Sequence, residues 1–153
     1  MNITKLIVSI AIPLIAAGIG SFFTTKSIPN WYAALQKPAF NPPNWIFGPV
    51  WTILFIMMGI ALYLVWTSGK ANNAALWIFG IQLGLNVLWS ILFFGMQSPL
   101  WAFVDIIALW LAILATIISF YSVSAIASYL LIPYILWVSF ATILNWKIMV
   151  LNS

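Results

Sequence analysis

The sequence contains no cysteine, histidine, glutamate or arginine, and its single acidic residue is Asp105. Disulfides are therefore excluded, and zinc, iron–sulfur and histidine-ligated haem sites lack their usual ligands. Ser-His-Asp and Cys-His triads cannot be assembled, and a paired-carboxylate mechanism would need a second acid. The residue inventory thus excludes most conventional enzyme chemistry and any ordinary metal site.

Charge is almost absent from the chain. Only 4% of its 153 residues are charged and 65% are hydrophobic, whereas a soluble domain carries roughly 25% charged residues. The five lysines stand singly at positions 5, 26, 37, 70 and 147 and form no basic stripe that would indicate nucleic-acid binding. The composition predicts an integral, multi-pass membrane protein whose main partner is the lipid bilayer.

Apolar segments of membrane-spanning length occur five times along the chain. We predict an all-α integral membrane protein, with residues 1–153 forming one domain, a single five-transmembrane-helix bundle. The expected spans are residues 5–25, 45–66, 74–94, 100–120 and 127–149. Pro13 should bend the first span, whose second half is rich in alanine and glycine and so permits close helix approach. Two lysines lie on one side of the membrane and three on the other, so they predict no orientation of the protein in the bilayer.

Residues 27–44 form the one long connection, and four prolines deny it a continuous helix. We expect this aromatic, proline-rich loop to fold over one mouth of the bundle as a lid. The alternative is that Trp31, Tyr32 and Trp45 belong to the aromatic belt at the membrane surface.

Larger and polar side chains recur at helical spacing within the spans. The predicted faces are Trp51, Phe55, Met58 and Leu62; Gln82, Asn86, Trp89 and Phe93; Trp101, Asp105, Ala108 and Ala112; and Tyr134, Trp137, Ala141 and Leu144, with Asn145 beside them. Polar amides on an apolar span should face the protein interior. The simpler alternative is that the tryptophans only fill seams between helices.

Two further features of the spans suggest roles. Asp105 lies about one turn inside the fourth span, where a charge by default indicates function. It could instead lie at interface depth, solvated or capping the preceding loop. Gly80 and Gly84 form a GxxxG pair away from Asn86, which predicts packing on another helix or on a second subunit.

Four short motifs, WY, KP, PP and FGPVW, occur together in WYAALQKPAFNPPNWIFGPVWTILFIMMGIALYLVW, residues 31–66. With LNVLWSILFFG (85–95), WAFVDIIALW (101–110) and LLIPYILWVSFATILNW (130–146), this pattern closely resembles the translocator proteins. That family, TspO/MBR, is also called the tryptophan-rich sensory proteins or peripheral-type benzodiazepine receptors. The resemblance covers nearly the whole chain from Trp31 onward.

The resemblance implies a five-helix bundle, usually a homodimer, that binds tetrapyrroles such as protoporphyrin IX and haem. It also implies binding of isoquinoline carboxamide and benzodiazepine drugs in a pocket between the helices, under the loop after the first span. No cofactor is required, and porphyrin is the ligand or substrate. The matching positions are Tyr32, Phe47, Trp51, Asn86, Trp89, Trp101, Asp105, Ala108, Trp137, Ala141 and Leu144.

One departure from the family concerns sterols. Animal members bind cholesterol, and the associated motif needs a tyrosine before a basic residue, whereas this chain has Trp146 followed at once by Lys147. We therefore discount cholesterol, on a motif that is weak even when intact. The expected location is a bacterial cell membrane.

Three classes of function follow. The first is a receptor, sensor or carrier for tetrapyrroles, with homodimerisation through Gly80 and Gly84. The second is a light- and oxygen-dependent porphyrin-degrading enzyme, with Trp51 and Trp137 as electron or radical participants and the ligand supplying the reactivity. The third is an ion-coupled transporter, which ranks lowest because Asp105 is the sole acid and has no obvious midplane partner.

Overall fold

The computed structural model covers residues 1–153 and is entirely helical. Its elements are α1 (Ile3–Ser27), the π-helical turn η1 (Ile28–Tyr32), α2 (Asn44–Thr67), α3 (Asn73–Ser90), the π-helical turn η2 (Ile91–Gly95), α4 (Pro99–Tyr121), α5 (Ala125–Tyr129) and α6 (Ile132–Leu151). Together they make five helices long and apolar enough to cross a membrane. The predicted five-helix, multi-pass membrane fold is confirmed.

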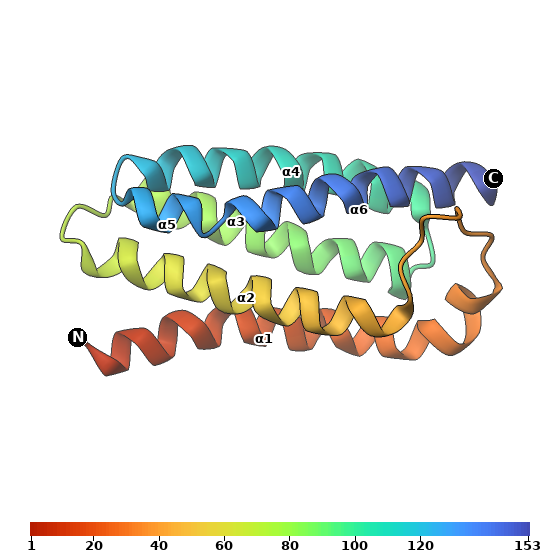
Figure 1. The fold of residues 1–153 in the computed structure, drawn as a ribbon, viewed down its shortest axis with the longest axis horizontal. Helices are drawn as coiled ribbons and strands as arrows, with labels where there is room; N and C mark the ends of the chain where they lie inside the picture. Colours follow the sequence, from red (N-terminus) through yellow and green to blue (C-terminus); the bar gives the residue numbers. More distant parts are fainter.

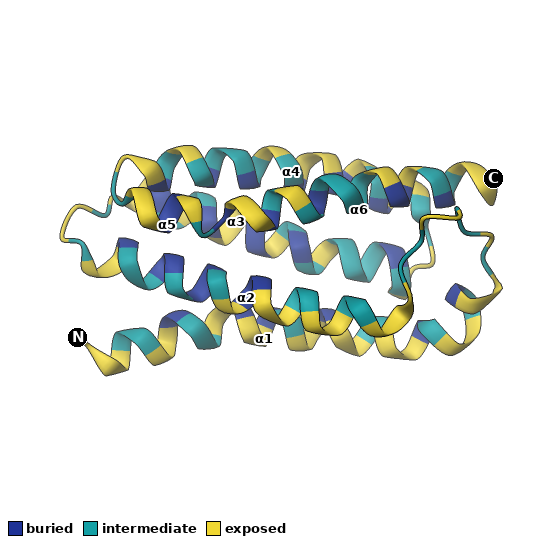
Figure 2. Ribbon diagram, in the orientation of Figure 1, coloured by how far each residue is buried: buried dark blue, intermediate teal, exposed yellow.

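The helices run side by side along one long axis, with the two termini at opposite ends (Figure 1). α1 packs mainly on α2, while α4 packs on both α3 and α6. Exposed residues lie mainly on the outward surfaces of the helices, and many of them are large and apolar (Figure 2). This is the pattern of a bundle whose outer surface faces lipid.

Side chains from the short connections cap several helices. Asn2, Asn72, Ser98 and Ser124 each accept a hydrogen bond from a backbone N–H three residues further on, at the start of α1, α3, α4 and α5. Helix N-termini leave such N–H groups without intrahelical partners, so these caps fix where each helix begins. The polar turns between the apolar segments therefore define the helix ends.

The first span is longer than predicted. The helix does not stop near residue 25, and Pro13 does not interrupt α1. It continues through η1, a π-helical turn that contains Pro29, which cannot donate a backbone N–H to the preceding turn. The connection to α2 is consequently shorter than the expected residues 27–44. We call residues 35–43 the lid loop; it crosses one end of the bundle (Figure 1).

The last span is divided into α5 and α6 rather than being one helix from residue 127. Pro133 explains the break, because it has no N–H with which to reach the carbonyl of Tyr129 and its ring would clash with that carbonyl in a continuous helix. Ser128 lies in α5 and donates a 2.8 Å hydrogen bond to the carbonyl oxygen of Ile117. This bond ties the short helix to α4.

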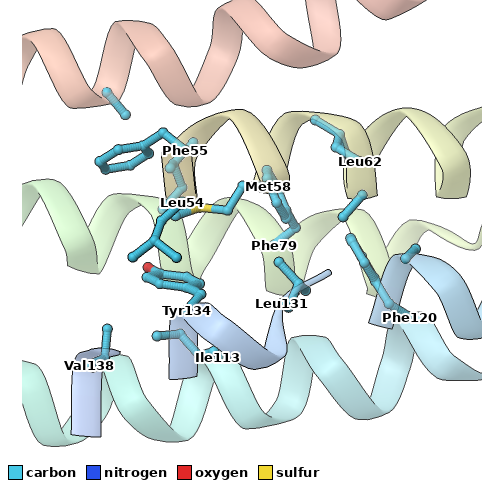
Figure 3. Close-up of a cluster of buried hydrophobic side chains, with 14 of the residues drawn as sticks. Leu54, Phe55, Met58, Leu62, Phe79, Ile113, Phe120, Leu131, Tyr134 and Val138 are labelled. Carbon is cyan, nitrogen blue, oxygen red and sulfur yellow. The ribbon is translucent and has the colours of Figure 1, made fainter. Parts of the chain in front are cut away.

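The main hydrophobic core fills the half of the bundle away from the lid loop. It brings together Leu54, Phe55, Met58 and Leu62 of α2, Phe79 of α3, Ile113 and Phe120 of α4, and Leu131, Tyr134 and Val138 of the last span (Figure 3). Phe79 and Phe120 stack with ring centroids 5.8 Å apart. Side chains fill this half of the bundle, so a sizeable cavity must lie in the other half.

A close approach between α1 and α2 depends on Gly59. A Cβ atom at this position would lie 2.6 Å from the Cα of Ile10 and 2.9 Å from the carbonyl oxygen of Ser9. That carbonyl receives no helical hydrogen bond, because the residue four positions later is Pro13. The glycine therefore lets α2 cover a backbone group that α1 itself cannot pair.

We predict that Gly59→Ala lowers the thermal unfolding midpoint in detergent, because the added methyl meets backbone atoms that cannot rotate away. Overpacking of this kind costs about 1–3 kcal/mol. The matched control is Gly18→Ala in α1, whose Cβ would meet no atom within 4 Å and which gains helix propensity. Equal midpoints for the two variants would contradict the prediction.

Candidate ligand cavity

A cavity of about 320 Å³ lies between α1, α2, α3 with η2, and α6. Of its 24 lining residues, 15 are hydrophobic, so a bound molecule would be held mainly by apolar and aromatic contact. The lining extends to Ile28 and Tyr32, just before the lid loop. The cavity thus occupies the half of the bundle that the main core leaves unfilled.

Aromatic rings form two walls of the cavity. On one side the ring of Trp137 lies edge-on to Trp51 at 6.4 Å and to Phe47 at 6.0 Å. On the other side Trp89 stacks on Phe93 at 5.1 Å. Aromatic pairs in such geometries contribute about 0.5–1.5 kcal/mol beyond their burial, and the same rings present faces and edges to a flat aromatic ligand.

A chain of buried polar groups begins at the cavity lining and leads into the main core. The side-chain N–H of Asn86 donates to the Tyr134 hydroxyl at 2.8 Å, and that hydroxyl donates to the Gln82 carbonyl oxygen at 2.8 Å. The predicted inward direction of this amide pair is confirmed. Asn86 also lines the cavity, and its carbonyl oxygen makes no hydrogen bond within the protein. This oxygen is available to a ligand.

A second polar connection holds one of the aromatic walls. The indole N–H of Trp89 donates to the side-chain oxygen of Asn145 at 2.9 Å, and Asn145 donates to the carbonyl oxygen of Pro99, also at 2.9 Å. These two bonds join α3, α6 and the first turn of α4. Trp89 is therefore fixed in orientation before any ligand arrives.

The wall between α1 and α2 consists of small residues. Ala17, Gly18 and Ser21 of α1 and Gly48 and Thr52 of α2 line the cavity, and a Cβ at either glycine would meet no atom within 4 Å. We predicted that the small residues of α1 serve close helix packing. This holds at Gly20, whose Cβ would lie 3.0 Å from the Ser90 hydroxyl oxygen. The others instead leave space.

Eight of the eleven predicted ligand-binding residues lie together around the cavity: Tyr32, Phe47, Trp51, Asn86, Trp89, Trp137, Ala141 and Leu144. The lining residues that sequence reasoning did not place there are chiefly Phe94, Phe140, Ile148 and the small residues of α1. The helical spacing of Phe140 and Ile148 with Trp137 and Leu144 was the available signal.

The structure does not bring Trp101, Asp105 and Ala108 into the cavity. Trp101 is 59% exposed and Ala108 is also exposed, so they lie on the outer surface of α4. Of the residues predicted to share a face of this span, only Asp105 is buried, and its buried neighbours on α4 are Ala102, Ile106 and Leu109. In a span that is apolar all round, periodicity alone does not identify the buried face.

Asp105 is buried, with 6% exposure, and neither carboxylate oxygen has a hydrogen-bond partner. The alternative in which this carboxylate caps α4 or lies solvated at the interface is wrong. Ser98 caps the helix instead, accepting from the backbone N–H of Trp101.

The aromatic residues around the loop divide between the two alternatives. Trp45 is 74% exposed and lies on the outside of the bundle, as a residue of the membrane-surface belt would. Tyr32 is buried and donates a 3.3 Å hydrogen bond to the side-chain oxygen of Asn41 in the lid loop. Trp31 packs edge-on against Phe93 at 5.5 Å. Only Trp45 therefore fits the belt interpretation.

Comparison with known proteins agrees with this architecture. The model of the TspO/MBR family matches residues 9–151. The chain belongs to the TspO/MBR family. It is 51% identical over 154 residues to the tryptophan-rich protein TspO of Archaeoglobus fulgidus, covering 100% of both chains. It is 51% identical to the tryptophan-rich protein TspO of Chlorobaculum tepidum, over 99% of this chain and 98% of that one.

The animal branch of the TspO/MBR family is also similar. The human translocator protein is 41% identical over 138 residues, which cover 88% of this chain and 82% of the human one. The matched region in each case includes most of the five helices. The family resemblance stated from the motifs is confirmed.

We predict that Tyr134→Phe destabilises this TspO/MBR protein, because it leaves the buried amides of Gln82 and Asn86 without their shared partner. An orphaned buried polar group costs about 1–3 kcal/mol. Thermal unfolding in detergent measures the loss. The control is Tyr121→Phe, whose hydroxyl is on an exposed side chain and makes no hydrogen bond within the protein. An unchanged Tyr134→Phe midpoint would show that the network contributes nothing to stability.

Proposed function

We propose that this protein is a membrane receptor, sensor or carrier that binds tetrapyrroles, and related flat aromatic drugs, in the cavity between its helices. The observation that carries the proposal is the cavity itself, with Trp51 and Trp137 on one side and Trp89 and Phe93 on the other. The family membership supports it. Isoquinoline carboxamide and benzodiazepine compounds are the drug classes we expect to compete.

Polar groups would orient the ligand. The free carbonyl oxygen of Asn86 lies at the cavity lining and would accept from a pyrrole N–H. Lys37 lies at the lid loop, with its ammonium 4.6 Å from the centre of the Tyr32 ring, and would attract a propionate. Because the chain has no histidine to ligate iron, metal-free protoporphyrin should bind comparably to haem.

The size of the cavity limits how a macrocycle enters. A volume near 320 Å³ is at the lower end of the ~300–1,000 Å³ typical of small-molecule pockets. It suits a flat drug-sized molecule, whereas a tetrapyrrole is larger. Binding of the macrocycle would thus require the lid loop to move or the ligand edge to protrude between α1 and α2.

The second candidate function is light- and oxygen-dependent degradation of the bound porphyrin. Trp51 and Trp137 lie edge-on at 6.4 Å, and both line the cavity where an excited porphyrin would lie. The ligand would supply the photochemistry, since the cavity lining contains no histidine, carboxylate, lysine or cysteine. Ion-coupled transport has less support, because Asp105 does not line the cavity.

A protoporphyrin IX titration followed by tryptophan fluorescence, in the dark and in light, distinguishes the two functions. A receptor or carrier gives saturable quenching with a stable porphyrin spectrum. An enzyme loses the porphyrin bands in light only, and Trp51→Phe abolishes this loss while leaving binding mostly intact. Trp45→Phe is the matched control, because Trp45 is on α2 but outside the cavity. Absence of saturable quenching would remove tetrapyrroles as ligands.

We also propose a homodimer through the outer face of α3. Gly80 and Gly84 are open there, and the neighbouring Trp77 is 73% exposed. A flat strip of small residues beside an exposed aromatic permits close approach of a second helix. The face is away from Asn86 and the cavity.

Gly80→Leu or Gly84→Leu should therefore weaken the dimer more than it weakens ligand binding. Cross-linking in detergent measures the dimer, and the fluorescence titration measures binding in the same samples. An unchanged dimer fraction in both variants would refute the assignment of this face.

A further inference from the structure

The lid loop is tied to the far end of the chain by one side chain. Asn152, just after α6, accepts a hydrogen bond from the backbone N–H of Gln36 at 2.9 Å and donates to the carbonyl oxygen of Gln36 at 2.8 Å. The two residues are 116 positions apart. The Asn152 side chain thus pairs with both the N–H and the C=O of Gln36, as the backbone of a neighbouring β-strand would.

Asn152 is itself held in place. Its side-chain nitrogen also donates to the carbonyl oxygen of Ile148 at 2.8 Å, and its backbone N–H donates to the same oxygen at 3.2 Å. These bonds join the side chain to the last turn of α6. The amide is therefore oriented toward the lid loop by the helix rather than free to rotate.

Other contacts that hold the lid loop involve residues of the cavity wall, and one of them is the Lys37 ammonium over the Tyr32 ring. Tyr32 donates to Asn41, and Phe140 packs edge-on against Phe40 at 6.2 Å. A ligand that enters the cavity touches Tyr32 and Phe140 and so disturbs these contacts. Asn152 does not line the cavity, so its bonds to Gln36 restrain the loop independently of the ligand.

The loop is suited to move as one piece. Pro38, Pro42 and Pro43 restrict its backbone, and the backbone N–H of Asn41 donates to the carbonyl oxygen of Pro38 at 3.0 Å to form an internal turn. Releasing the loop at residue 36 would therefore free a stiff segment that crosses the end of the bundle (Figure 1).

We propose that Asn152 is a latch that holds the lid loop closed and so sets the rate at which ligand enters and leaves the cavity. The inference rests on the proposed ligand-binding function for its kinetic effect. The latch itself is a property of the ligand-free protein. Asn152 is a positioning residue, since it acts on the ligand only through the loop.

The first test is hydrogen exchange of the ligand-free protein. Asn152→Ala should speed exchange of the amides at residues 35–41 on the order of tenfold, the effect expected from losing two exposed hydrogen bonds. Exchange in α3 and α4 should not change. Ser153→Ala is the control, because its side chain bonds only to the carbonyl oxygen of Val150. Unchanged loop exchange, or equal acceleration in both variants, would overturn the latch.

The second test is stopped-flow exchange of protoporphyrin IX. Asn152→Ala should raise the association and dissociation rates together by a similar factor and leave Kd nearly unchanged, because the open state is reached more often while the cavity is intact. A higher Kd with an unaltered association rate would mean that the variant damages the cavity, and would overturn the proposal. If the porphyrin binds to neither protein, the ligand assignment fails, and hydrogen exchange still decides the latch.

A variant whose lid loop is cross-linked to the end of α6 should show the opposite effect, slower ligand exchange. This test does not depend on a destabilised protein. The chain has no cysteine, so Gln36→Cys combined with Asn152→Cys can be joined selectively by a short bifunctional thiol reagent. Ligand exchange should slow after cross-linking, relative to the same variant without the reagent. Exchange at an unchanged rate in the cross-linked protein would show that ligand does not pass under the lid loop, and would overturn the proposal.

Discussion

Membrane helices gain little from hydrophobic burial against one another, since lipid tails are as apolar as their side chains. The bundle therefore depends on close packing and on a few hydrogen bonds between helices. The Tyr134 hydroxyl joins α6 to two amides of α3, and Asn145 joins α6 to Trp89 and to the start of α4. Between α1 and α2, close packing takes the place of such hydrogen bonds, because Gly59 lets the two backbones approach. These contacts position the aromatic walls of the cavity.

Much of this arrangement was predictable from the sequence. The length of the apolar segments gives the five helices, and the polar residues Gln82 and Asn86 identify the inner face of α3 because lipid cannot solvate an amide. The fourth span shows the limit. It offers many apolar residues on every side, and its actual inner face was decided by packing against α3 and α6. The length of η1 and the break before α6 depend on how the helices adjust around Pro29 and Pro133. Helix propensity does not predict these adjustments.

The two halves of the bundle serve different purposes. Away from the lid loop, stacked rings such as Phe79 and Phe120 fill the interior. Toward the lid loop, small residues of α1 replace large ones and the interior is hollow. The same five helices thus combine a tightly packed half with a space that a flat molecule can occupy, and the π-helical turns η1 and η2 place Tyr32 and Phe93 in its lining.

The small-residue wall between α1 and α2 also affects how a measured ligand affinity should be interpreted. Where Gly18 and Gly48 lie, the barrier between cavity and bilayer is only as thick as the backbone. A molecule bound there would contact acyl chains, and an apolar ligand that is free would itself dissolve largely in lipid. The reference state for binding is then the membrane phase. Two ligands with equal affinity per mole in lipid will differ, per mole in water, by the ratio of their partition coefficients.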